Sequence, residues 1–268
     1  MTYYYPIKNN QELQLFIHLN LKHIMKYLKY LILTVLVIVI AGFIAIKVFS
    51  EKKPEGAVGT EANKLAYAMM DKLNKRAFDS IPYLSFEFFS GGHKYFWDKK
   101  NNKVIVEWDK NKVIMNLNSL EAQSFIGSQQ IPGEAGDKLR NKAWSYWCND
   151  SFWLIAPFKV FDKGTVRKRL TTEEGEKGLL IEYLSGGVTP GDSYLWILNE
   201  ENIPTGWKMW TSILPVEGLY TSWTGWADFM GAKLSLNHKL AGKDVEMKNV
   251  KTGTSFTEFG YTSDPFVI

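Results

Sequence analysis

An uncharged run over residues 30–46 (YLILTVLVIVIAGFIAI) constrains this 268-residue chain more than any other feature. With the apolar residues that follow, up to residue 49, it approaches the roughly 20 apolar residues that carry a helix across a bilayer. Inside lipid every backbone N–H and C=O group must be bonded within the segment, so such a segment crosses as a helix. The sequence therefore predicts one transmembrane helix over residues 30–49.

Two other interpretations of this run fit the residues less well. A buried core helix conflicts with a run that is apolar on every face and has lysines at both ends. A cleaved signal peptide needs a small-x-small site, and the run ends in IAIKVFSE, which has none. An uncleaved signal anchor fits best, with Lys22, Lys26 and Lys29 on the cytoplasmic side. We expect a single-pass protein of the inner (cytoplasmic) membrane whose C-terminal domain lies in the periplasm.

The start of the chain suggests a later initiation site. From Met25 the chain reads MKYLKYLILTVLVIVI, the form of a bacterial export signal, and residues 1–24 have no role in that design. We hypothesise that Met25 is the initiator. The sequence thus predicts four segments: a basic cytoplasmic segment (1–29), the anchor (30–49), a polar tether (50–59) and one periplasmic domain (60–268).

The positive charge belongs to the anchor and its flanks. The chain has a pI of about 8.8, but residues 1–53 hold seven Lys and two Glu, whereas residues 54–268 hold 25 Lys and Arg against 26 Asp and Glu. A nucleic-acid-binding domain needs clustered basic residues on its folded part. The sequence therefore predicts no nucleic-acid partner.

Motifs that carry chemistry are missing from the sequence. There is no phosphate-binding glycine loop, no GxSxG, no HExxH and no CxxC, and the four histidines share no metal-ligand spacing. The single cysteine, Cys148, has no histidine paired with it by sequence and fits a small buried side chain. We expect a protein that is not an enzyme and that has no metal and no cofactor.

Alternation dominates the exported part. After an amphipathic helix predicted from Thr60 to Arg76, with Thr60 as its cap, apolar residues alternate with polar ones from Tyr83 onward. Turn residues separate roughly ten short strands, which lie in two groups, over residues 83–117 and 166–250. This pattern is typical of one large, curved antiparallel sheet or an open barrel.

A non-alternating insert separates the two groups of strands. It contains a predicted helix over residues 137–147 and the aromatic stretch 149–158, and it could cover the mouth of the sheet. All ten Trp of the chain lie in the exported part. Each single Trp fits an ordinary core position, but together they predict an apolar pocket suited to acyl chains. The candidate ligand-binding residues are Trp97, Trp108, Trp144, Trp147, Trp153, Phe158 and Trp196.

The order of helix, strands, aromatic insert and strands resembles the periplasmic lipoprotein-carrier superfamily. The stretches most similar to lipoprotein-carrier-like proteins of Bacteroidetes are residues 151–164 (SFWLIAPFKVFDKG) and 223–234 (WTGWADFMGAKL). The resemblance covers residues 60–250 as pattern more than identity. It implies an α+β fold with an open half-barrel and a helical lid, and a non-enzymatic carrier of an apolar ligand. A retained anchor distinguishes this chain from soluble carriers.

The leading prediction is thus a membrane-anchored periplasmic protein that binds a lipid or a lipidated protein in an aromatic-lined half-barrel. A second possibility is a structural or interaction module of the envelope, with a packed barrel that binds protein or glycan. A third, an envelope hydrolase, would require polar side chains that converge inside the barrel, and its first candidates are Asp150, Asp162 and His238.

Overall fold

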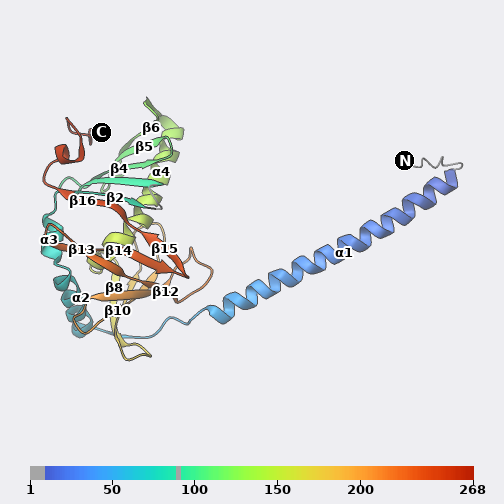
Figure 1. Cartoon of the computed structure of the whole chain (residues 1–268), viewed down its shortest axis with the longest axis horizontal. Helices are drawn as coiled ribbons and strands as arrows, with labels where there is room; N and C mark the ends of the chain where they lie inside the picture. The colour runs from blue at the N-terminus through green and yellow to red at the C-terminus, as the bar shows by residue number, and fades with distance from the viewer. Residues whose placement is uncertain (1–9, 89–91) are drawn as a thin grey trace. The chain divides into compact units, whose positions relative to one another are not determined.

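The computed structural model describes residues 10–88 and 92–268, with side chains from residue 14 onward. It divides the chain into two units, Met1–Ser50 and Glu51–Ile268. Most of the first unit is one helix, α1 (Asn10–Phe49). Figure 1 shows the elements of both units, whose mutual placement is not determined.

Helix α1 is twice as long as the predicted transmembrane segment. It begins at Asn10, and its 40 residues span about 60 Å at 1.5 Å per residue. The bilayer core takes up about 30 Å of that length. The stretch Gln14–Phe49 is long and apolar enough to cross a membrane, a property that a signal sequence shares, and none of its most apolar window is buried in the protein. The interpretation as a buried core helix is therefore wrong.

The second unit contains two open antiparallel sheets in place of the single sheet predicted. The smaller has seven strands in the order β16-β2-β3-β4-β5-β6-β7. Residues on each strand alternate between the two faces, as the pleat requires. These strands are β2 (Tyr83–Phe88), β3 (His93–Asp98), β4 (Lys103–Trp108), β5 (Asn111–Asn116), β6 (Ala122–Ile126), β7 (Gln129–Gln130) and β16 (Lys248–Gly253).

The larger sheet has nine strands in the order β1-β8-β9-β10-β11-β12-β14-β13, with β15 also paired to β14. Strand β13 lies in a stretch that the sequence pattern did not mark as a strand. The strands are β1 (Ala57–Val58), β8 (Thr165–Thr171), β9 (Lys177–Tyr183), β10 (Ser193–Leu198), β11 (Pro204–Trp210), β12 (Leu219–Ser222), β13 (Thr224–Phe229), β14 (Ala232–Leu240) and β15 (Lys243–Glu246).

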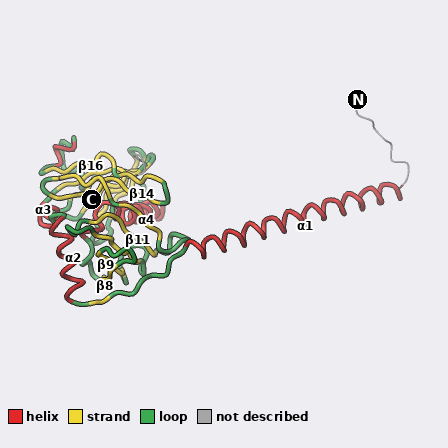
Figure 2. The backbone as a smooth tube through the Cα atoms, turned by 60° about the horizontal axis from the view of Figure 1, so that its bottom comes forward, coloured by secondary structure: helices red, strands yellow, loops and turns green. Residues whose placement is uncertain are grey.

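The predicted first helix of the domain is present as two helices, α2 (Thr60–Lys72) and α3 (Lys75–Ser80). The break falls at Asn74, whose backbone is left-handed (φ 56°) and whose side chain accepts a hydrogen bond from the N–H of Ala77. Thr60 is the first helical residue and not the cap, which is Gly59. In Figure 2, α2 and α3 lie outside the strands.

The insert between the two groups of strands contains the predicted helix, which is longer than expected, but its first part forms strands β6 and β7, which were not predicted. Its helical part comprises α4 (Gly133–Asp150), α5 (Phe152–Ile155) and a 3-10 turn, η1 (Ala156–Phe158). Helix α4 packs on β4, β5 and β6, and α5 packs on β14. The insert therefore contacts both sheets.

The outer face of the seven-stranded sheet carries an apolar stripe in register, Phe96, Ile105 and Ile114. The C-terminal segment, which includes η2 (Phe256–Phe259), packs over this stripe. Phe266, near the end of the chain, is almost completely buried there. Both faces of this sheet are therefore covered.

The segment predicted as a tether is held on the domain. Strand β1 pairs with β8, Lys53 forms an ion pair of 2.6 Å with Glu182, and Glu51 forms one of 2.7 Å with Lys208. The domain thus begins immediately after the long helix.

Candidate functional site

A cavity of about 520 Å³ lies between the helical insert and the nine-stranded sheet. Its volume falls within the range of about 300–1,000 Å³ that is usual for small-molecule sites. Trp97 of β3 contributes from the other sheet. Asn102 and Leu117, beside β4 and β5, also lie on that side. The rest of the lining comes from helices α4 and α5, the segment after η1, strands β9, β10, β11 and β14, and two loops.

Aromatic rings form the wall of the cavity. Phe152 of α5 packs against Tyr194 of β10 and Trp207 of β11, with ring centroids 4.9 and 5.7 Å apart. Trp153 meets Trp207 edge-on at 5.5 Å. Such edge and offset contacts are the arrangement that aromatic rings prefer. The wall is apolar and is held in place by rings from three elements.

Three polar atoms in this wall have no partner. The hydroxyl of Tyr183 and the indole N–H groups of Trp97 and Trp207 are buried and make no hydrogen bond within the described part of the chain. A buried donor without a partner costs about 1–3 kcal/mol. These three atoms are buried behind the cavity wall and are not exposed to the cavity itself.

Two loops form the mouth of the cavity, and we call residues 184–191 and 211–218 the mouth loops. The buried carboxylate of Asp192 joins them. It accepts hydrogen bonds from the Thr189 hydroxyl (2.6 Å) and from the Ser212 N–H (3.2 Å). The Tyr194 hydroxyl also points to Asp192, at 3.4 Å, and burial raises the pKa of this hydroxyl.

Few charged or reactive groups line the cavity. Lys159 pairs with Asp162, and exposed Lys163 lies beside them. Burial raises the pKa of the Cys148 thiol to about 12, so the thiol is neutral at physiological pH. This environment does not activate a nucleophile.

The structure brings four of the seven predicted ligand-binding residues to the cavity: Trp97, Trp144, Trp147 and Trp153. The other three lie in the packed core. Trp108 packs edge-on against Tyr146 at 5.5 Å, Phe158 stacks on Phe78 at 4.2 Å, and Trp196 packs between other tryptophans. The ligand-binding role of all seven remains a prediction.

Sequence reasoning missed several lining residues. The missed residues belong to segments that were predicted, but the direction in which each side chain points was not: Phe152, Tyr183, Tyr194 and Trp207. In strands buried on both faces, polarity does not distinguish the side that faces a cavity. The one available signal was the aromatic stretch that begins at Phe152.

The three candidate residues of the hydrolase interpretation do not converge. Asp162 pairs with Lys159. His238 is buried against Trp153 and Trp223, with ring centroids at 5.4 and 4.4 Å. Asp150 binds neither of the other two.

Asp150 instead joins a buried cluster that the sequence did not reveal. Its Oδ2 atom accepts hydrogen bonds from Tyr95 (2.5 Å) and from Nδ1 of His93 (2.7 Å). Burial raises the pKa of the Asp150 carboxyl, and the Tyr95 and His93 hydrogen bonds counteract part of this effect. Neither Asp150 nor His93 lines the cavity. The cluster connects β3 to the end of α4.

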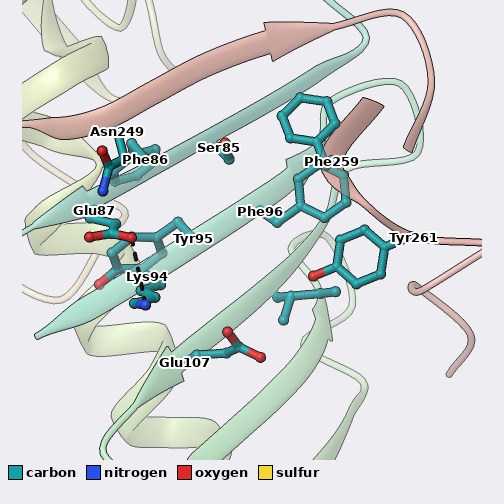
Figure 3. Close-up of a pocket in the computed structure, with 11 residues that line it drawn as sticks. Ser85, Phe86, Glu87, Lys94, Tyr95, Phe96, Glu107, Asn249, Phe259 and Tyr261 are labelled. Atoms are coloured by element: carbon teal, nitrogen blue, oxygen red, sulfur yellow. Dashed lines mark ion pairs between the residues drawn. The ribbon is translucent and has the colours of Figure 1, made fainter. Parts of the chain in front are cut away.

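A second, smaller pocket of about 190 Å³ lies on the outer face of the seven-stranded sheet (Figure 3). Phe96 and Tyr261 stack there at 5.1 Å, and Lys94 pairs with Glu87 at 3.6 Å. The C-terminal segment occupies much of this face. The volume of this second pocket is below the usual range for small-molecule sites, so the larger cavity is the better candidate.

Comparisons with known proteins give a structural likeness and no match at the level of sequence. No protein-family model matches the chain, and no curated protein matches it. The fold is similar to that of a DUF1329 family protein from Desulfovibrio piger, with a TM-score of 0.40 and 8% sequence identity. The match covers 74% of this chain and 95% of that chain. The likeness concerns the arrangement of the chain and says nothing about a ligand.

Proposed function

We propose that this chain is a membrane-anchored envelope protein that binds an apolar ligand, a lipid or the acyl group of a lipidated protein, in the aromatic cavity. Helix α1 is the uncleaved anchor, the C-terminal domain lies in the periplasm, and the protein is not an enzyme. We propose that the two open sheets form the half-barrel and that the helical insert is its lid, as the lipoprotein-carrier resemblance implies; two open sheets with a helical insert beside them support this.

The observation that carries the proposal is the lining of the 520 Å³ cavity. Eight aromatic side chains line it, and the charged side chains Lys159 and Asp162 pair with each other. Burial of apolar ligand surface at roughly 25 cal/mol per Å² is the main source of affinity that such a wall can offer.

Native mass spectrometry of the full chain, extracted in mild detergent, tests the proposal. We expect co-purifying lipid in the wild type and much less in Val188→Trp, which places a large ring at the mouth. Val188 is 39% exposed, so the substitution leaves the core unchanged. Val267→Trp is the matched control, because Val267 is 64% exposed and lies outside the cavity.

Two results would contradict lipid binding: a wild-type protein without bound lipid, or equal lipid content in the two variants. In either case the interaction module, with protein or glycan as partner, becomes the better account. Pull-down of envelope proteins with the same preparation would then identify that partner.

A further inference from the structure

The first residue of the folded domain is fixed to one of the mouth loops. The Glu51 N–H donates to the carbonyl of Glu217 at 2.9 Å. The indole N–H of Trp210 donates to the Glu51 carbonyl at 2.8 Å, and Lys208 pairs with the Glu51 carboxylate at 2.7 Å. Because α1 ends only two residues before Glu51, this loop is tied to the point where the chain leaves the helix.

The same loop carries exposed apolar side chains at the cavity mouth. Ile213 is 57% exposed and lines the cavity, as does Val188 of the other mouth loop. Leu184, at the base of that second loop, is also exposed. Only four chain steps, at most ~14 Å, separate Ile213 from Glu217. Ile213 is therefore within a short reach of the end of α1.

Positive charge accompanies these apolar residues. Lys52 follows Glu51 directly, and Lys163 lines the cavity; both side chains are exposed. Two contributions bind a protein surface to lipid: burial of apolar side chains in the bilayer, and attraction of lysines to anionic headgroups. A soluble protein partner would not require these residues to lie close to the end of α1.

We propose that the mouth loops dock on the surface of the bilayer that α1 spans, so that the cavity opens toward lipid. The ligand then enters from the membrane and does not cross water. This inference rests on the proposed function in two respects: α1 is retained as an anchor, and the cavity is the ligand site.

The test uses the full chain in vesicles of phosphatidylethanolamine and phosphatidylglycerol. Cys148→Ala removes the native thiol, and Ile213→Cys then carries an environment-sensitive fluorophore. Phospholipids with a spin label high on the acyl chain quench fluorophores that enter the bilayer. Ile126→Cys is the matched control, because Ile126 is 46% exposed on β6, in the other sheet and outside the cavity.

We expect several-fold stronger quenching at position 213 than at position 126, with a blue-shifted emission at position 213. Equal quenching at the two positions would overturn docking. Measurement of co-purified lipid on the same samples separates the two proposals. Quenching at 213 without bound lipid would support docking and contradict ligand binding. Bound lipid without selective quenching would support ligand binding and contradict docking.

Discussion

His238 should make the folded domain sensitive to acid. Its side chain is only 2% exposed and lies against the rings of Trp153 and Trp223. Burial lowers the pKa of His238 to about 4, because a charged imidazolium would lose its hydration, and nearby backbone groups of Ser222 and Trp153 offset only part of this effect.

The sign and size of the effect follow from proton linkage. Between about pH 6.5 and about pH 4 the unfolded chain binds a proton at His238 and the folded protein does not. The contribution of His238 to stability is complete above the unfolded pKa and is lost as the pH falls toward the folded one. A difference of ~2.5 pKa units at about 1.4 kcal/mol each gives ~3.5 kcal/mol in full. About 3 kcal/mol of this is lost by pH 4, where the folded group is half protonated.

The assay is urea unfolding of the full chain in detergent at pH 7 and at pH 4, monitored by tryptophan fluorescence. Other groups titrate as well, so the informative quantity is the comparison with His238→Leu, which has a similar volume and no titrating group. We expect the wild type to lose ~3 kcal/mol more unfolding free energy than the variant over this interval. His23→Leu, on α1, is the control and should behave as the wild type does. Equal pH dependence in wild type and His238→Leu would refute the reasoning.

Three further predictions concern other buried groups. Asp150→Asn should retain most of the stability because both hydrogen bonds go to one oxygen, whereas Asp150→Ala leaves the Tyr95 hydroxyl unpaired and should cost about 1–3 kcal/mol in urea unfolding. Gly136→Ala should lower the unfolding free energy by at least about 1–3 kcal/mol, because its new Cβ would lie 2.1 Å from the carbonyl oxygen of Ile131; an unchanged midpoint would contradict this. Cys148, with its thiol pKa raised to about 12 by burial, should react slowly with maleimide at pH 7.5 in the folded protein and rapidly in urea.

The class of fold could be predicted from the sequence because alternation along strands is a local property. The strands from Tyr83 to Leu117 and from Val166 to Leu240 correspond closely to observed ones. The division into two sheets was not predictable, since which strands become neighbours depends on pairings distant in sequence. The clearest case is β16, near the C-terminus, which pairs with β2 through Lys251 and Ser85.

The candidate site was predictable only in part, for a related reason. The aromatic insert marked Trp144, Trp147 and Trp153, because a stretch this rich in large rings needs a partner surface. Tyr183 and Trp207 could not be identified, since strands in this sheet are buried on both faces and polarity does not distinguish the side that faces the cavity. The attachment of Glu51 to the domain was also unpredictable, because it depends on contacts with residues more than 150 positions away.

The C-terminal segment over the seven-stranded sheet has a consequence for biogenesis. Strands β2 to β7 are synthesised early, yet β2 gains its second neighbour, β16, only from residues near the end of the chain. The stripe of Phe96, Ile105 and Ile114 is likewise covered only by the C-terminal segment. A domain that is threaded across a membrane from its N-terminus therefore exposes an unpaired strand and an apolar face until translocation ends. Such surfaces bind one another in incomplete chains. If the domain is exported as proposed, we expect its nascent form to keep these surfaces exposed until the last residues, among them Phe266, emerge.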